Sequence, residues 1–431
     1  MPRRTFSDRR RGLSSISVDL SPMFESRPFR SLIMGQIASL IGTQMRYVAM
    51  AWQIFLLTGS SAAVGLLGLA EVIPMVVVSI IAGPMADIRD RKKIMFWSQA
   101  ALMVVSATLA VVALADRPAL WTLYGLTALG AAFDALDKLA RNAVIPNLVG
   151  PDKIAPAIAL KQISFQVSLI VGPALGGLAV AGFSLSVVYA IDAATFIVAL
   201  LSLRALPAFE PRGERGPALT LLREGLRFSI GRPLIRSVFL VDLTAMIFGM
   251  PRAVFPALAR GFGIGAGGLG VLYSAPAIGA LIGASLSGWV GRIGRHGAAI
   301  FIAAAVWGAS IAAAGIFGMS FVPLLAFLAL AGAADVFSAV FRGTLVQEAT
   351  PDELRGRVTA VNSLVVTGGP RVGDIEAGFA ASFFGARGSV IAGGVACLIG
   401  TGALFFTSPE LRNYARKISR QPDHKHDGGE V

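Results

Sequence analysis

Long apolar segments recur along this chain and restrict the folds that it can adopt. The runs at 64–86, 94–115, 187–203 and 301–318 each carry one charged residue at most. A helix of about 20 apolar residues is long enough to cross the ~30 Å hydrocarbon core of a bilayer. Only 15% of the 431 residues are charged, against about 25% in an ordinary soluble domain. These features predict an all-α membrane protein.

The apolar sequence divides into twelve predicted transmembrane helices, which are separated by clusters of charged residues and by glycines and prolines. The helices begin near residues 31, 62, 94, 118, 156, 185, 234, 268, 297, 320, 354 and 388. The stretch 204–233 separates the first six from the last six, and its amphipathic part at 221–228 is expected to lie on the membrane surface. We predict a basic tail at 1–28, a six-helix bundle at 29–203, a linker at 204–233, a second six-helix bundle at 234–408 and a tail at 409–431.

Arginine and lysine fall mainly in alternate loops. One set of loops, with both tails and the linker, holds nearly all of them, whereas the other set holds only Arg117, Arg260 and Arg387. Loops rich in arginine and lysine stay on the cytoplasmic side of a membrane. The pattern therefore predicts a multi-pass protein of the bacterial inner membrane with both termini in the cytoplasm. It also accounts for the formal net charge of +13 without any binding of nucleic acid.

The two halves of the chain repeat each other at a nearly constant offset. Arg46 in the first predicted helix and Arg252 in the seventh are 206 positions apart. In the fourth helix Asp134 precedes an arginine by seven residues, and in the tenth Asp335 does the same. A parallel repeat about an axis along the membrane normal places the substrate site between the halves, near mid-bilayer. We therefore expect the two bundles to be related by a pseudo-twofold axis.

A glycine, an aspartate and an arginine follow the second predicted helix at the spacing of a known loop motif. Gly83, Asp87 and Arg91 resemble the cytoplasmic loop motif of the major facilitator superfamily, G-x-x-x-D-R-x-G-R-[RK]. The resemblance implies that these residues gate the cytoplasmic face. It also implies that Arg91 bridges Asp87 to Asp134 or Asp137 in the fourth helix.

A second copy of this motif follows the eighth predicted helix. It retains Gly288, Arg292 and Arg295, but Gly291 stands where the aspartate belongs. We assign the same gating role to its retained residues, without a carboxylate. In the fifth helix, the segment 171–177 resembles the core of the antiporter motif of the same superfamily, which favours export.

Three further segments carry a more specific resemblance. The residues at 133–149, 248–256 and 368–378 look like the enterobactin-exporter branch of the drug:proton antiporter-3 family, and the likeness extends over about 28–408. The resemblance implies siderophore efflux coupled to proton entry. It does not by itself identify the molecule that is carried.

Ionisable residues at bilayer depth are costly and mark candidate functional sites. Because their positions are equivalent in the repeat, we expect Arg46 and Arg252 to face each other across a central cavity and contact the substrate, with Asp242 and Asp335 beside them. A guanidinium suits a catecholate-like ligand, because it donates paired hydrogen bonds and stacks on aromatic faces. The alternative is that Glu71 and Asp242 simply neutralise the two arginines.

Buried carboxylates are the candidate proton carriers. We expect Glu71, Asp134, Asp374 and Glu376 to include the coupling group, since desolvation favours the protonated form of a carboxyl. A structural ion pair between Arg371 and Asp374 is the alternative for that residue. For Asp192, in the sixth predicted helix, structural pairing is the expected role.

The residues predict a transporter of this fold, and the resemblance implies that it is a proton-coupled efflux transporter of the major facilitator superfamily that exports an enterobactin-like siderophore by alternating access. The alternatives are a multidrug or other small-molecule exporter and, less favoured, a nutrient importer of the same fold. The predicted helices lack histidine, and Cys397 is the single cysteine, so neither an enzyme nor a metal site is expected. We expect no cofactor. The expected partners are a small-molecule substrate, protons and the lipid bilayer, and the protein is expected to function as a monomer.

Overall fold

The computed structural model describes residues 19–209, 218–288 and 293–415, apart from the side chains of 82–88 and 218. Regular structure within these ranges is helical, without strands. The first half contains α2 (Ser21–Glu25), α3 (Arg27–Thr58), α4 (Ser61–Ile88), α5 (Arg91–Val112), α6 (Leu120–Leu148), η1 (Pro151–Lys153), α7 (Ile154–Gly182), α8 (Leu185–Ser202) and η2 (Leu203–Ala205). The second half contains α9 (Ala218–Gly231), α10 (Pro233–Phe248), η3 (Arg252–Val254), α11 (Phe255–Gly261), α12 (Gly265–Ser285), α13 (His296–Phe317), α14 (Phe321–Ala349), η5 (Asp352–Leu354), α15 (Arg355–Thr407) and α16 (Pro409–Arg412).

Local capping explains where several helices begin and end. The side chains of Ser26 and Ser60 accept hydrogen bonds from the first turns of α3 and α4. Asp90 does the same for α5 by accepting from the amide of Lys92. Such caps satisfy backbone donors that have no partner within the helix. At the end of α3, Gly59 adopts φ 65°, the left-handed conformation that favours glycine at a helix terminus.

Nine segments in the described chain are long and apolar enough to cross a membrane. Two more helices, α3 and α6, have 32 and 29 residues but a more polar composition. The last of the nine segments spans Asp352–Thr407, and Gly385 with φ 71° breaks α15 into two helices. Divided in this way, and with α10 and α11 taken as one broken helix, the long helices lie where the sequence predicts them, while twelve membrane crossings remain a prediction.

The predicted helix starts agree with the structure to within four residues. The seventh predicted helix differs from expectation, because it is not continuous. It consists of α10, the 3-10 turn η3 and the short α11, and Arg252 lies in the turn. Pro251 and Pro256 flank this break, and a proline inside a helix removes a backbone hydrogen bond.

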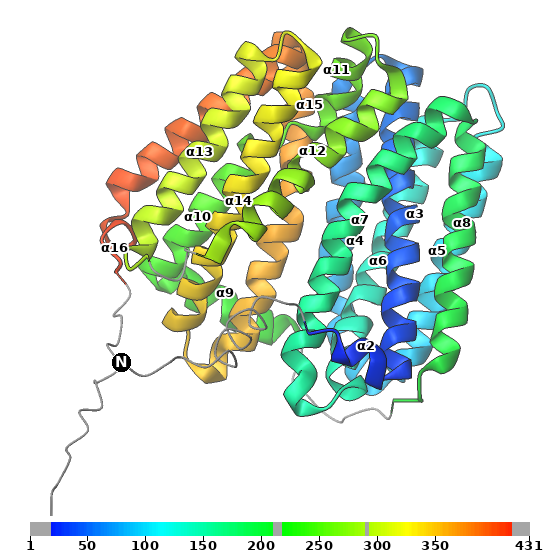
Figure 1. Cartoon of the computed structure of the whole chain (residues 1–431), viewed down its shortest axis with the longest axis horizontal. Coiled ribbons are helices and arrows are strands. Elements are labelled where there is room, and N and C mark those ends of the chain that lie inside the picture. The colour runs from blue at the N-terminus through cyan, green and yellow to red at the C-terminus, as the bar shows by residue number, and fades with distance from the viewer. Residues whose placement is uncertain (1–18, 210–217, 289–292, 416–431) are drawn as a thin grey trace, which may run out of the picture.

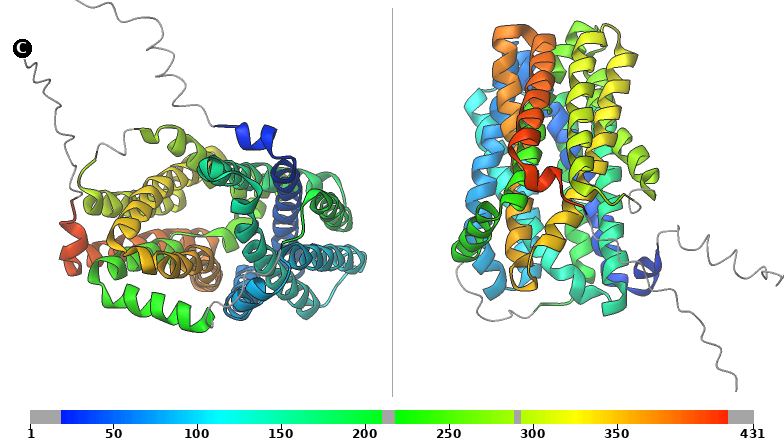
Figure 2. Two further views of the ribbon diagram at one scale, coloured as in Figure 1. Left: turned by 90° about the horizontal axis from the view of Figure 1, so that it is seen from below. Right: turned by 90° about the vertical axis from the view of Figure 1, so that its left-hand side faces the viewer.

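The long helices form two groups that correspond to the two halves of the sequence. In the first group α3 packs on α7 and α8, while α6 packs on α4 and α5; in the second, α14 packs on α12 and α13, while α15 packs on α10 and α13. The groups lie side by side in Figures 1 and 2. The exact bounds of the two predicted bundles, and of the linker between them, remain a prediction.

Close contact between the groups runs through α4 against α15 and α7 against α12. Glycines allow it: a Cβ on Gly378 would lie 2.6 Å from the carbonyl oxygen of Ser61, and one on Gly177 would lie 2.6 Å from that of Ala266. Small residues let helix backbones approach in a membrane. These glycine contacts lie toward the end of the molecule that carries α11, which is opposite the end with α2 and α9 (Figure 1).

We call the end that carries α2, α9 and the loop at 89–93 the basic end. The expected amphipathic stretch of the linker forms α9 here, while 210–217 lie outside the described residues. Leu222 and Phe228 of α9 pack against the apolar core of the second group. Arg357 of α15 pairs with Glu224 of α9, with 2.6 Å between nitrogen and oxygen.

Candidate functional site

A cluster of charged and aromatic side chains joins the two halves where α4 meets α15. Arg252 and Asp374 form its centre, with 2.7 Å between Nη2 and Oδ2. Tyr47 of α3 donates its hydroxyl to the same carboxylate oxygen at 3.2 Å, and its ring lies under the guanidinium of Arg252 with 5.7 Å from Cζ to the ring centroid. Tyr273 of α12 donates to the backbone oxygen of Arg252 at 3.1 Å.

A second ion pair completes this cluster. Glu71 of α4 and Arg371 of α15 are 3.1 Å apart, and Arg371 also donates to the backbone oxygen of Thr367. We call Tyr47, Glu71, Arg252, Tyr273, Arg371 and Asp374 the interface cluster. Its members come from both halves, so a relative movement of the halves must change these contacts.

The break in the seventh helix positions the centre of the cluster. Because α10 ends at Phe248, the chain turns through η3 and brings Arg252 beside α15. Gly373 packs against the backbone of α10 and leaves no room for a side chain between the helices. This contact brings α15 close enough for its buried Asp374 to reach Arg252.

Arg46 has a different environment from the one that the repeat suggests. It pairs with Asp192 of α8 at 3.1 Å, and Ser106 of α5 donates to the same carboxylate oxygen at 2.6 Å. Each arginine is held by its own carboxylate, Asp192 or Asp374, and the expectation that both face a central cavity and contact the substrate stays a prediction. The expected structural pairing of Asp192 is confirmed.

The other candidate residues in the second half form a triad. The guanidinium of Arg342 in α14 lies 2.6 Å from the carboxylate of Asp242 in α10. It also lies 3.4 Å from the carboxylate of Asp335, which is two turns earlier in α14. Asp242 therefore neutralises Arg342 and not Arg252, which corrects one alternative. The expected pairing of Arg371 with Asp374 is also replaced, because Arg371 pairs with Glu71 and Asp374 with Arg252.

The remaining proton candidates lie in unlike surroundings. Asp134 pairs with Lys138 at 2.6 Å and its side chain is 32% exposed. The neighbouring Asp137 is buried in a two-pronged pair with Arg141. Glu376 of α15 is half-buried and makes no ion pair or side-chain hydrogen bond among the described residues. Asp134 is thus partly solvated, whereas Asp137 is buried.

The gating residues are only partly described. Gly83 and Asp87 lie in α4, but their side chains fall outside the description, as does Arg292. Arg91 begins α5 and donates to the backbone oxygen of Ala143 in α6 at 3.3 Å. Gly288 and Arg295 are exposed at the basic end.

The bridge expected from Asp87 through Arg91 to Asp134 or Asp137 stays a prediction, because the side chain of Asp87 lies outside the described residues. Asp134 pairs with Lys138, and Asp137 pairs with Arg141. Arg91 reaches the same helix through a backbone oxygen.

Sequence reasoning missed the two tyrosines of the interface cluster. Tyr47 follows Arg46 directly and so lies on a neighbouring face of α3, which is the face toward α15. A tyrosine beside a charged residue within an apolar helix is a usable signal, because a buried phenolic hydroxyl needs a hydrogen-bond partner.

Both Asp374 Oδ1 and Asp192 Oδ1 are buried without a hydrogen-bond partner among the described residues. Gly42 packs against Asp192 Oδ1, where an added Cβ would lie 2.7 Å away.

Comparison with known proteins identifies the family. The family model described as transmembrane secretion effector matches residues 17–426. The enterobactin exporter EntS of Citrobacter koseri is 28% identical over 414 residues, which cover 95% of this chain and 98% of that one. The enterobactin exporter EntS of Escherichia coli is 28% identical over 400 residues, which cover 92% and 95%.

Solved structures share the fold at low sequence identity. The nucleoside transporter NupG superposes with a TM-score of 0.69 at 16% identity, covering 89% of this chain and 99% of that one. A bacterial homologue of the iron transporter ferroportin in an inward-facing state superposes with a TM-score of 0.66, with the same identity and coverage. With the family match over almost the whole chain, this protein belongs to the transmembrane secretion effector family of the major facilitator superfamily of membrane transporters.

Proposed function

We propose that this protein exports a siderophore of the enterobactin class across the bacterial inner membrane, coupled to proton entry by alternating access. The support is the family membership, the two relatives named as enterobactin exporters and the repeat that places a site between the halves. The single observation that carries the mechanism is Asp374, a buried carboxylate that binds Arg252 in its own half and Tyr47 in the other. The basic end faces the cytoplasm in this proposal.

Asp374 suits an exchange of substrate for a proton. An ionised carboxylate accepts hydrogen bonds from the hydroxyls of a catechol ring, and Oδ1 has no partner among the described residues. Proton binding removes the negative charge and weakens the same acceptor. Substrate and proton therefore compete for Asp374, and this competition is what an antiporter needs. Arg252 holds a paired-oxygen ligand, and Tyr47 and Tyr273 offer aromatic faces to it.

The arrangement of the halves fits one stage of this cycle. The glycine contacts close the end that carries α11. We propose that Gly83, Asp87, Arg91, Gly288, Arg292 and Arg295 form the gate at the basic end, through which substrate enters from the cytoplasm. Glu71, Asp134 and Glu376 stay alternative proton carriers, and Arg46, Asp242 and Asp335 lie outside the interface cluster.

The test uses everted membrane vesicles, in which export appears as uptake driven by an imposed proton gradient. Asp374→Asn should abolish gradient-driven uptake of a catecholate siderophore, because the amide cannot exchange a proton. Binding of the siderophore to the purified variant should remain measurable, since an amide oxygen still accepts hydrogen bonds. Asp116→Asn is the matched control, because Asp116 is exposed in the loop between α5 and α6.

Three results would decide the matter. Full gradient-driven uptake by Asp374→Asn at normal expression would exclude this residue as the proton carrier. Uptake by right-side-out vesicles instead of everted ones would indicate an importer. Equal transport of unrelated aromatic drugs would indicate a multidrug exporter.

A further inference from the structure

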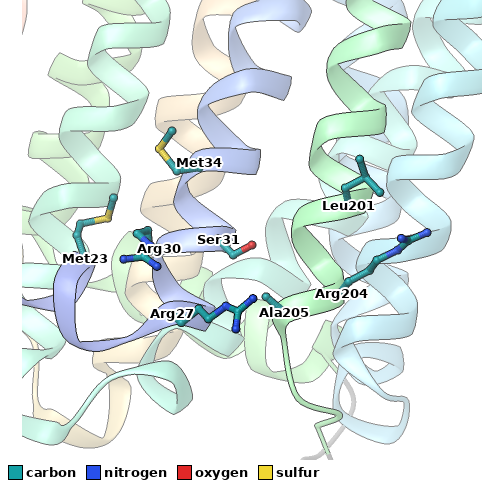
Figure 3. Close-up of a pocket in the computed structure, with 8 residues that line it drawn as sticks. All are labelled: Met23, Arg27, Arg30, Ser31, Met34, Leu201, Arg204 and Ala205. Atoms are coloured by element: carbon teal, nitrogen blue, oxygen red, sulfur yellow. The ribbon is translucent and has the colours of Figure 1, made fainter.

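A pocket of about 650 Å³ opens at the basic end of the first half, away from the interface cluster (Figure 3). One wall is the start of α3, which supplies Arg27, Arg30 and Met34. The opposite wall is the end of α8 with η2, which supplies Leu201 and Arg204. The short helix α2 adds Met23 at its edge. Three arginines therefore line one pocket whose remaining lining is largely apolar.

The local sequence builds this pocket by helical periodicity. Residues 27, 30, 31 and 34 are spaced so that they lie on one face of α3, and 201, 204 and 205 are spaced in the same way. The two walls are joined by Ser31, which donates its hydroxyl to the backbone oxygen of Ser202 at 2.8 Å. The arginines thus project from helices that are fixed to each other, and the pocket is part of the folded bundle.

The three arginines have no protein counter-charge among the residues that the structure describes. Within the described part of the chain, Arg27, Arg30 and Arg204 make no ion pair and no side-chain hydrogen bond. Glu25, a carboxylate of the adjoining α2, is bound by Lys153 instead. Like charges gathered at one site repel each other unless an anion lies between them. The pocket therefore has the charge of a site for an anionic group.

The apolar wall shows which anion fits. The side chains of Met34 and Leu201 are 57% and 50% exposed beside the arginines. Basic pockets between helices on the cytoplasmic side suit lipid head groups, and Arg binds phosphate in a two-pronged fashion. We propose that this pocket binds an anionic phospholipid, with the phosphodiester on the arginines and the start of an acyl chain along Met34 and Leu201. Free phosphate shares the first contact but cannot use the second.

The experiment measures lipid retention by native mass spectrometry of the full-length protein purified in detergent. Phosphatidylglycerol and phosphatidylcholine of the same chain length are added separately. The triple variant Arg27→Gln, Arg30→Gln and Arg204→Gln should bind phosphatidylglycerol at least about tenfold more weakly and leave phosphatidylcholine unchanged, since a basic residue near an anionic lipid contributes about 1 kcal/mol. The matched control is Arg223→Gln, Arg227→Gln and Arg236→Gln, which removes the same charge from exposed positions of α9 and α10.

Each further result supports the lipid site or overturns it. An equal loss in the control triple would show that general surface charge attracts the lipid, and would overturn the proposal. Displacement of phosphatidylglycerol by millimolar inorganic phosphate would show a free-anion site and would overturn it as well. Met34→Gln with Leu201→Gln should weaken lipid binding without changing phosphate binding. If the triple variant does not fold, the single exposed change Arg30→Gln should still give a measurable loss, and no loss would contradict the proposal.

Discussion

The two halves place an arginine at equivalent positions of the repeat but hold it in different ways. In the first half, Arg46 and Asp192 belong to one helix group, and Ser106 of the same group completes the contact. In the second half, Arg252 and Asp374 also contact Tyr47 of the other group. An ion pair enclosed in one group keeps its partners when the halves move. A pair that also binds the opposite half can respond to that movement.

The difference begins in the local structure of the two helices. α3 is continuous for 32 residues and carries Arg46 within it. The corresponding helix of the second half breaks into α10, η3 and α11, and Arg252 lies at the break. Unwound segments within the membrane occur where the backbone is buried in protein or lines a cavity. The broken helix therefore marks the half that provides Arg252 and Asp374, the centre of the interface cluster.

The largest expected effect comes from breaking the enclosed pair. Asp192 is fully buried, so Asp192→Asn leaves the charge of Arg46 without compensation. Removing one partner of a buried ion pair costs about 3–5 kcal/mol. We expect a clear loss of thermal stability for the purified variant in detergent, measured by fluorescence-detected size-exclusion chromatography after heating.

A double variant separates this structural effect from a role in transport. Arg46→Gln with Asp192→Asn removes both charges and should recover much of the lost stability, because amides can pair with each other. If Asp192→Asn alone were as stable as the parent, the enclosed pair would not be structural. A stable double variant without transport would support the predicted contact of Arg46 with substrate.

The second expected effect distinguishes the two arginines by a change that preserves charge. Lysine keeps the positive charge but loses the two-pronged donor and the flat face. Arg252→Lys should weaken siderophore binding about tenfold, as expected for the loss of one charged hydrogen bond of roughly 1.5 kcal/mol. Arg46→Lys should leave binding nearly unchanged. Isothermal titration of both purified variants checks this, and equal losses would contradict the division of roles.

Much of the fold was accessible from the sequence, because hydrophobic length and loop charge are local properties. The predicted helix starts and the repeat needed only apolar runs and the spacing of residues such as Asp134 and Asp335. The break near Arg252 could also have been predicted, since Pro251 and Pro256 flank it. The regular offset between the repeated halves instead favoured a continuous helix here, like α3 in the first half.

The ion-pair partners could not be read from the sequence, because they depend on how distant helices pack. Arg46 lies 146 positions before Asp192, and Arg252 lies 122 positions before Asp374. Local spacing favoured the nearer pairing of Arg371 with Asp374, yet packing of α4 on α15 offers Glu71 to Arg371. A repeat predicts equivalent positions, and it does not predict that their neighbours are equivalent.

A smaller effect is expected from the single hydrogen bond that joins Asp374 to the other half. Tyr47→Phe keeps the aromatic ring and removes the donor to Asp374. Loss of this hydrogen bond should destabilise the contact between the halves by about 1 kcal/mol. The equilibrium between joined and separated halves would then shift roughly fivefold toward separation. Tyr124→Phe is the control, because its hydroxyl bonds to Ala63 within one half.

The readout for this pair is the labelling rate of a cysteine introduced at Ala62, beside Gly378, in a Cys397→Ser background. Tyr47→Phe should raise the labelling rate, and Tyr124→Phe should leave it unchanged. Equal rates in both variants would show that the hydrogen bond between the halves does not hold them together.

The smallest effect should come from the exposed ion pair between α9 and α15. Glu224 and Arg357 are 2.6 Å apart, but their side chains remain 46% and 35% exposed. Such pairs contribute about 0–1 kcal/mol to stability and weaken with salt. Glu224→Gln should therefore lower the melting temperature slightly in dilute buffer and not at all in concentrated salt.

By contrast, Gly225 packs against the backbone of Arg357, where a Cβ would lie 2.6 Å from the backbone oxygen of Arg357. Gly225→Leu should displace α9 at any salt concentration. If Glu224→Gln were the more damaging change, charge and not close packing would hold α9 in place.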